Sequence, residues 1–153
     1  MKLVVTGYEE VFGPWMYGKI LNAQYIPGQG HIIGLLDTVR GPIAACHYES
    51  CNGSSILVHL AGEGKDWLNR EFLWFCFFYP FEQLNVTKII APIDSNNSAS
   101  IRWTEHCGFT LEATLKDACP KGDMLLYTMT REACKWLQLK DRYRGKASGS
   151  SSS

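Results

Sequence analysis

Short apolar runs, separated by turn residues, follow one another through the first half of the chain and indicate extended strands. Three of these runs predict strands at His31–Asp37, Pro42–Glu49 and Ser55–Ala61. The segments Gly41-Pro42 and Asn52-Gly53 lie between them, and both contain residues that favour tight turns. We therefore expect the three strands to pair as an antiparallel meander.

Three other segments predict helices. Gly13-Pro14 is typical of a helix start, and an apolar stripe continues from there to about Asn22. An almost wholly apolar segment predicts a buried helix from near Asp66 to about Pro80. The third helix is expected at Ser98–Cys107, because Gly108 directly after it favours a helix end.

The remaining apolar runs predict strands at Lys88–Ile93, Phe109–Lys116 and Met124–Thr130. The first of these follows Ser55–Ala61 through the long helix, so a right-handed crossover should pair the two strands in parallel. A short helix is expected within Arg131–Arg144. This order of elements predicts a mixed α/β domain with a single parallel strand pair.

Length and composition limit the class of protein. The 153 residues suffice for one domain with its own core, expected at 1–144, followed by a Gly/Ser-rich tail at Gly145–Ser153. Basic and acidic residues balance at 15 each, so nucleic acid and anionic membranes are not expected partners. The apolar run Phe72–Phe81 is about half the ~20 residues that a membrane helix needs, and no signal segment opens the chain.

Six cysteines are present without a Cys-x-x-Cys pair. This usage indicates reduced thiols of a cytoplasmic protein, most of them filling the core. A metal site built from Cys46, His47, Cys51 and His59 matches no common zinc spacing, so no metal is expected.

Two segments have the residue types that binding chemistry requires. The first, His59–Asp66, ends a strand with a glycine corner before a helix, where free backbone amides bind phosphate groups. A plain glycine turn is the alternative interpretation of this corner. The second, Asn97–Phe109, follows a strand and ends in Gly-Phe; taken alone, it also fits an ordinary helix capped by Asn97 or Ser98.

Together these segments resemble the motifs of GNAT N-acetyltransferases. The pattern N-x-x-S-x-x-x-x-E-x-x-G-F begins at Asn97, and the corner reads H-L-A-G-E-G where the family has Q/R-x-x-G-x-G/A. The resemblance spans roughly Ile32–Leu137 and is strongest to the branch with ribosomal-protein N-acetyltransferases. Trp67–Glu71 and Tyr79–Phe81 resemble small members encoded by tailed bacteriophages.

The resemblance implies a mostly antiparallel twisted sheet with one splayed parallel strand pair and helices on both faces. It also implies acetyl-CoA as co-substrate, with its pantetheine arm between the splayed strands. The residues that the resemblance assigns to cofactor binding are Leu57, Val58, Leu60, Gly62, Gly64, Lys65, Asp66, Asn97 and Ser100.

For catalysis, the resemblance implies direct attack of an amine on the thioester. His59 is the best candidate base, because a histidine titrates near neutral pH; a simply packed histidine is the alternative. Glu49 and His47 are weaker candidates on the preceding strand. Thr104 stands where many members of the family have a tyrosine that assists the leaving thiolate, which puts fast catalysis in question.

Two functions remain open. One is acetylation of a primary amine, such as a protein N-terminus, a lysine or a small amine. The other is a catalytically silent structural or accessory protein of a phage particle, in the host cytoplasm or the virion. For that second function, the apolar helix Trp74–Phe81 and the tail Gly145–Ser153 would contact another copy or a phage protein.

Overall fold

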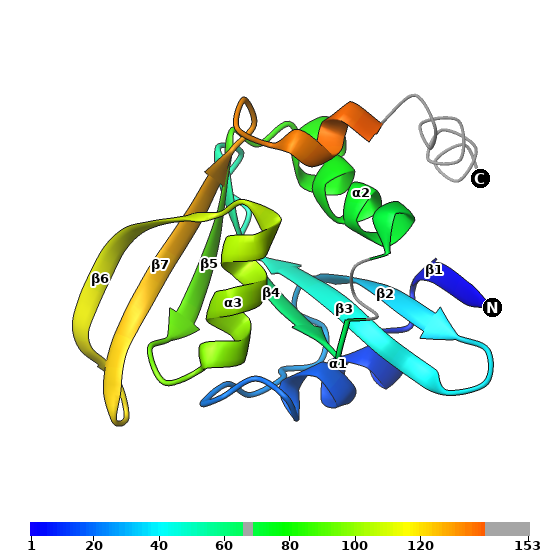
Figure 1. Cartoon of the computed structure of the whole chain (residues 1–153), viewed down its shortest axis with the longest axis horizontal. Coiled ribbons are helices and arrows are strands. Elements are labelled where there is room, and N and C mark those ends of the chain that lie inside the picture. Colours follow the sequence, from blue (N-terminus) through cyan, green and yellow to red (C-terminus); the bar gives the residue numbers. More distant parts are fainter. Residues whose placement is uncertain (66–68, 140–153) are drawn as a thin grey trace.

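The computed structural model describes residues 1–65 and 69–139. Seven strands of this part form one sheet, in the order β1-β2-β3-β4-β5-β7-β6 (Figure 1). Their bounds are β1 (Lys2–Thr6), β2 (His31–Asp37), β3 (Gly41–Glu49), β4 (Ser55–Gly62), β5 (Lys88–Asp94), β6 (Thr110–Cys119) and β7 (Gly122–Thr130). All neighbours pair antiparallel except β4 and β5, so the predicted mixed fold with one parallel pair is confirmed.

Helices cover both faces of this sheet, as predicted. They are α1 (Glu9–Tyr17), α2 (Arg70–Phe78) and α3 (Ser98–Cys107), with a π-helical turn at Tyr79–Gln83 and a short 3-10 helix at Lys135–Leu139. Phe12 and Met16 of α1 pack on one face against Ile32 and Ala45. Helices α2 and α3 lie against the opposite face, where the larger core cluster sits (Figure 1).

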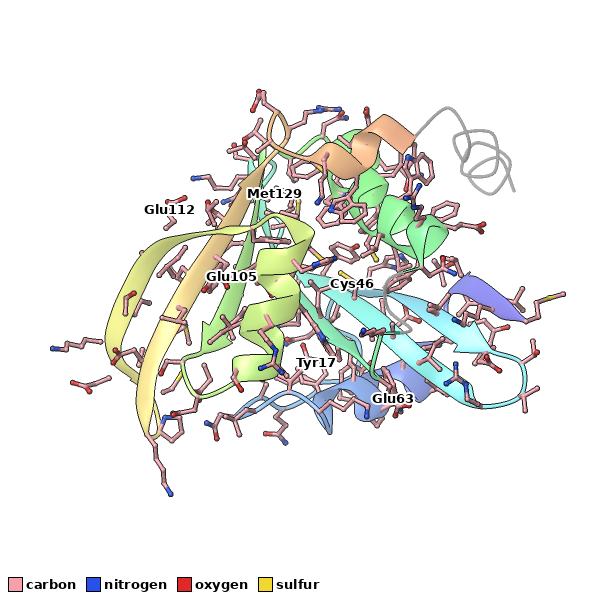
Figure 2. All side chains as sticks on the ribbon, viewed as in Figure 1. Tyr17, Cys46, Glu63, Glu105, Glu112 and Met129 are labelled. Atoms are coloured by element: carbon pink, nitrogen blue, oxygen red, sulfur yellow. The ribbon has the colours of Figure 1, made fainter. Side chains whose placement is uncertain are left out.

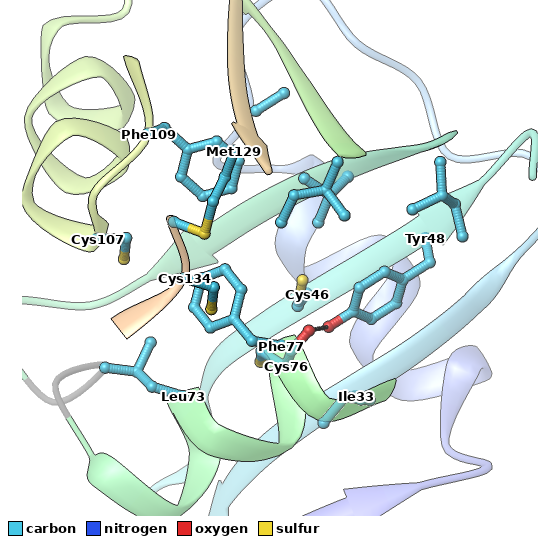
Figure 3. Packing of buried hydrophobic residues seen from close by; sticks show 14 of the residues in the cluster. Ile33, Cys46, Tyr48, Leu73, Cys76, Phe77, Cys107, Phe109, Met129 and Cys134 are labelled. Atoms are coloured by element: carbon cyan, nitrogen blue, oxygen red, sulfur yellow. Dashed lines mark hydrogen bonds between the residues drawn. The ribbon is translucent and has the colours of Figure 1, made fainter. Parts of the chain in front are cut away.

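The larger core contains most of the cysteines, as Figure 3 shows. Cys46, Cys76, Cys107 and Cys134 are buried, which confirms the core-filling role predicted for most of the thiols. Burial raises the pKa of Cys107 to about 12, which makes it a poor nucleophile. Cys46 and His47 alternate on β3 and belong to opposite faces, because neighbouring strand residues point to opposite sides of a sheet. Within residues 1–65 and 69–139, no group of three or more His, Cys, Asp or Glu side chains could hold a metal ion.

Strands β4 and β5 pair over only three positions and then separate. The parallel pairs run from Ser55–Lys88 to Leu57–Ile90. Beyond them, β4 stays paired with β3 as far as Gly62, and β5 stays paired with β7 as far as Asp94. The backbone polar groups on one edge of each strand therefore face a gap instead of a neighbouring strand. This is the splayed pair that the sequence predicted.

The first helix begins earlier than the sequence predicted. Helix α1 starts at Glu9 and ends at Tyr17, so Pro14 lies inside it and not at its start. Proline inside a helix removes one hydrogen bond. Phe12 and Met16 are one turn apart and almost fully buried, and their burial stabilises the helix across the proline.

The second helix begins later than predicted, at Arg70 instead of Asp66. Asn69 precedes it in an extended conformation, and its side chain accepts a hydrogen bond from the backbone amide of Phe72. Asn69 is therefore the N-cap, and the helix begins directly after it. Asp66, predicted to bind the cofactor, and the neighbouring Trp67 and Leu68 lie outside the described residues.

The apolar helix is largely buried within the chain itself. Phe72, Leu73, Trp74, Cys76, Phe77 and Phe78 of α2 are buried, and Phe81 of the π-helical turn is too. Phe72, Leu73, Cys76, Phe77 and Phe81 belong to the larger core cluster, whereas Trp74 and Phe78 pack with Phe75 in a separate cluster. The predicted contact of Trp74–Phe81 with another copy or a phage protein stays a prediction. The tail Gly145–Ser153 and the last part of Arg131–Arg144 lie outside the described residues. None of the helices in the described part of the chain is long and apolar enough to cross a bilayer.

Candidate active site

A cavity of about 170 Å³ occupies the gap between the splayed strands. Val58, His59 and Leu60 of β4 line one side, and residues Ala91–Asp94 of β5 line the other. Consecutive strand residues point to opposite faces, so a cavity that contacts three in a row must run along the strand edge. Among the predicted cofactor residues on β4, Val58 and Leu60 line the cavity, whereas Leu57 is the last residue paired with β5.

Helix α3 forms a further wall of this cavity, which we call the splay cavity. Asn97, Ser100 and Thr104 all line it, because residues three and four apart share one helix face. The Asn97 side chain caps the helix by accepting from the amide of Ser100, and Gly108 ends the helix in a left-handed conformation. Thr104 is 2% exposed, so its hydroxyl lies inside the protein at the cavity wall.

The glycine corner after β4 differs in part from the predicted phosphate loop. Gly62 still belongs to β4, and the amide of Glu63 donates to the Ile43 carbonyl at 2.9 Å, so that amide is already used. The Glu63 carboxylate pairs with Lys19 Nζ at 2.9 Å (Figure 2). The turn itself comes at Gly64 and Lys65, both exposed, where Gly64 has a φ of 54°. Gly62, Gly64 and Lys65 thus lie at the corner beyond the splay cavity and not among its lining residues.

His59 and Glu49 form a pair on the sheet face that carries α1. His59 Nε2 lies 3.1 Å from Glu49 Oε1, across the register of β3 and β4. The side chain of His59 is 15% exposed, and this burial lowers its pKa; the hydrogen bond and charge of Glu49 oppose the shift, and His47 adds to it. The imidazole is therefore neutral at neutral pH. An ionised carboxylate only accepts, so Nε2 donates and Nδ1 is the nitrogen able to accept a proton.

His47 lies directly opposite His59 in the register and has different partners. Its Nε2 is 2.7 Å from the carbonyl oxygen of Gln29, and its Nδ1 is 2.6 Å from the Tyr17 hydroxyl. His47 is only 2% exposed. Gly30 approaches it so closely that a Cβ there would lie 2.5 Å from His47 Nε2. Both nitrogens of His47 are therefore occupied by hydrogen bonds.

A second cavity, of about 220 Å³, lies beside this cluster, and we call it the polar pocket. Tyr17, Gln24, Gln29, His47, Glu49 and His59 contribute its polar lining. His59 lines both the polar pocket and the splay cavity, and so does Ala23. One imidazole thus borders both cavities.

The segment after α1 crosses the open end of the splay. Ile20, Leu21 and Asn22 line the splay cavity, and Asn22 Nδ2 donates to Asp94 Oδ2 at 2.6 Å. Asp94 ends β5, and it also accepts from the amide of Asn96 at 2.8 Å. These hydrogen bonds, first that of Asn96 and then that of Asn22, keep the pKa of Asp94 low, so it stays ionised. The bond fastens the segment that contains Asn22 to β5 across the gap.

Sequence reasoning did not find Tyr17, Gln29, Asn22 and Asp94 as parts of the site. Tyr17 is 30 positions from His47, and Asn22 is 72 positions from Asp94. No local pattern connects residues so far apart. Local signals existed for His47, Glu49 and His59, whose strand positions predict a shared face, and for the α3 residues Asn97, Ser100 and Thr104.

The sheet order, the splayed parallel pair and α3 at the splay define the GNAT acetyltransferase fold. A mutant of the spermidine N-acetyltransferase SpeG from Vibrio cholerae superposes with a TM-score of 0.65 at 14% identity, over 90% of this chain and 95% of that one. The same enzyme in complex with CoA and spermine gives a TM-score of 0.59 at 18% identity, over 76% and 72% of the two chains. A GNAT-family acetyltransferase from Bacillus anthracis gives 0.53 at 15% identity, over 66% of each chain.

These structural matches extend to the fold and no further. No protein-family model matches the chain, and no curated protein matches it in sequence. The narrower resemblance to ribosomal-protein and phage acetyltransferases stays a prediction.

Proposed function

We propose that the chain is an N-acetyltransferase that transfers the acetyl group of acetyl-CoA to a primary amine. The observation that carries this proposal is the position of His59, which borders both the splay cavity and the polar pocket. An acetyl thioester in the first space and an amine in the second would meet at this imidazole. Spermidine N-acetyltransferase, one structure of which holds CoA and spermine, has the same fold, and this supports both the co-substrate and the amine acceptor.

The splay suits the binding of an extended chain. Beyond Leu57, the β4 edge has no β5 neighbour, so its backbone groups can bond a pantetheine arm as a strand would. Val58, Leu60, Asn97 and Ser100 line that space. Gly64 and Lys65 at the corner would lie near the phosphates, where Lys65 supplies a positive charge.

The reaction then follows from the side chains at the junction. His59 Nδ1 takes a proton from the amine, whose nitrogen then attacks the thioester carbonyl carbon. Glu49 holds the imidazole through Nε2 at 3.1 Å and fixes its orientation. The carbon–sulfur bond breaks, and the Thr104 hydroxyl on the opposite wall stabilises the leaving thiolate with a hydrogen bond.

The binding half of the proposal is tested by filling the splay cavity. In Ser100→Trp the indole would occupy the α3 wall of the cavity, whereas in Ala99→Trp, one residue away, it would lie on an exposed position. Calorimetry should show saturable binding of acetyl-CoA to the unmodified chain and to Ala99→Trp, with loss of binding in Ser100→Trp. Absence of binding by the unmodified chain at millimolar acetyl-CoA would overturn the proposal.

A second candidate function is a catalytically silent GNAT domain in a phage particle. Thr104 favours it, because threonine replaces the tyrosine that many such enzymes place at the leaving thiolate. The carboxylate of Glu63 at the phosphate corner also favours it, since it repels an anionic ligand. Binding of acetyl-CoA without release of free thiol, over a panel of primary amines, would support this second function over the first.

A further inference from the structure

The polar pocket beside His59 has an unusual hydrogen-bond polarity. Its lining includes a carboxylate, a phenol and two imidazoles, together with Gln24 and Gln29, whose side-chain amides can both donate and accept. Which of these groups can donate, and which can only accept, follows from the partners they already have.

The sequence of bonds starts at the Gln29 carbonyl. A carbonyl oxygen only accepts, so His47 Nε2 must donate to it across the 2.7 Å separation. His47 is buried, and a neutral imidazole with its hydrogen on Nε2 has a lone pair on Nδ1. Tyr17 must therefore donate its hydroxyl hydrogen to that Nδ1 at 2.6 Å. The Tyr17 oxygen is left with lone pairs alone.

The other two groups also face the pocket as acceptors. Glu49 accepts from His59 through Oε1, and a carboxylate has more lone pairs than this one bond uses. His59 donates through Nε2, so its Nδ1 is an acceptor. Burial, followed by the charge of Glu49, raises the pKa of Tyr17 well above its usual range. The phenol therefore stays protonated, and its O–H donates the hydrogen bond to His47. Tyr17, Glu49 and His59 thus all offer lone pairs.

The size of the pocket limits the ligand further. About 220 Å³ corresponds to roughly seven water molecules at ~30 Å³ each. The apolar part of the lining, Ala23 and Ile26, suits a few methylene groups. A primary ammonium has three N–H donors and one positive charge, whereas an alcohol of the same length has one donor and no charge.

We propose that the polar pocket is the acceptor subsite, that it selects the ammonium end of a primary aliphatic amine, and that Tyr17 is a specificity-determining residue whose oxygen His47 fixes as an acceptor. This inference rests on the proposed function, because the amine must lose its proton to His59 before it reacts. The ammonium binds first through Tyr17, Glu49 and His59. His59 Nδ1 then takes one proton, and the neutral amine attacks the thioester carbon. The second proton passes from the nitrogen to the leaving thiolate as the carbon–sulfur bond breaks.

The test measures binding without reaction. The chain saturated with CoA, which has no acetyl group to transfer, is titrated with n-butylamine and with n-butanol. Butylammonium should bind and butanol should not. Tyr17→Phe should weaken butylammonium binding by about tenfold or more, since it removes one hydrogen bond to a charged group. The matched control Tyr25→Phe changes a tyrosine whose ring contacts Tyr17 and His47 but is not part of the pocket lining, and should bind like the unmodified chain.

Glu49→Gln provides a second variant of nearly the same shape. It removes the charge and should weaken butylammonium binding while leaving CoA binding unchanged. Equal binding of butanol and butylammonium, or equal affinity in Tyr17→Phe and Tyr25→Phe, would overturn the inference. Failure of CoA itself to bind would instead overturn the proposed function. Selective binding of butylammonium without any turnover of acetyl-CoA would support the proposed ammonium subsite and overturn the proposed acetyltransferase activity.

Discussion

Two histidine–carboxylate pairs lie on this sheet and differ mainly in where they are. His59 of β4 pairs with Glu49 of β3 at 3.1 Å, and His31 of β2 lies 3.7 Å from Glu9 of α1. In both histidines burial is the main cause of a lowered pKa, and the paired carboxylate opposes it. Similar chemistry is thus present twice.

The difference lies in what each histidine ring borders. His59 is on the strand that loses its partner, so its ring borders the splay cavity. His31 is on β2, where it pairs with Tyr48 of β3 but lies beyond Ile33, the last residue of β2 that pairs with β1. Its ring packs on the Tyr79 ring, with the centroids 4.7 Å apart. A neutral histidine with a carboxylate partner is therefore not sufficient for a catalytic base. In the proposed function, the two cavities that the His59 ring borders make the difference, because His31 lines neither of them.

The largest effect is expected from removing each imidazole in turn. His59→Gln should lower kcat for amine acetylation by about 10²–10⁴-fold, the usual contribution of a general base. His31→Gln is the matched control and should leave kcat within a few-fold. Release of CoA thiol under saturating acetyl-CoA measures both. An equal fall in kcat in the two variants would show that His59 has no catalytic role that His31 lacks.

The next effect concerns pH. The proposed base must be neutral, so activity should fall as pH drops through the lowered pKa of His59, which places the acid limb below the ordinary histidine value of about 6.5. Glu49 opposes the lowering, because it stabilises the imidazolium. Glu49→Gln should therefore move the acid limb to still lower pH and reduce kcat by about tenfold through loss of orientation.

Glu9→Gln is the corresponding change in the other pair. It alters His31 in the same direction but should leave the acid limb of the kcat profile where it is. A pH–rate profile for each variant checks this point. If the acid limb shifts in Glu9→Gln and not in Glu49→Gln, the titrating group is His31 and not His59.

A smaller effect is expected on the opposite wall of the cavity. Thr104→Val removes the hydroxyl and nearly keeps the volume of this buried side chain. If the hydroxyl assists the leaving thiolate, kcat should fall by about three- to tenfold, since one neutral hydrogen bond contributes about 1 kcal/mol. The KM for acetyl-CoA should change little. An unchanged kcat would show that the thiolate leaves without help from Thr104.

The smallest effect is expected at the glycine corner. Glu63→Gln removes a carboxylate that is half exposed and pairs with Lys19. Acetyl-CoA should then bind about two- to threefold more tightly at low salt, because a nearby like charge is removed, and the gain should fade at high salt. Calorimetry at two ionic strengths measures it. A weaker affinity in this variant would place the phosphates away from the corner.

Much of this site follows from local sequence. Asn97 and Gly108 cap α3 on both sides, so Asn97, Ser100 and Thr104 were predictable as one helix face. Strand alternation likewise places His47, Glu49 and His59 together. Other details depended on packing: Pro14 lies inside α1 because Phe12 and Met16 bury their side chains. Asn69, and not the glycine corner, sets the start of α2, because its side chain bonds the Phe72 amide.

The sequence by itself determined β2 to β7, the turns, α3 with its caps, and the crossover that makes β4 and β5 parallel, whereas β1 was not predicted as a strand. These depend on residues close together in the chain. Only the tertiary structure decided that Tyr17 reaches His47, that Asn22 reaches Asp94, and that His59 borders two cavities. The physical reason is that hydrogen bonds between distant segments depend on how α1 and the segment after it pack on the sheet, and no local pattern records that packing.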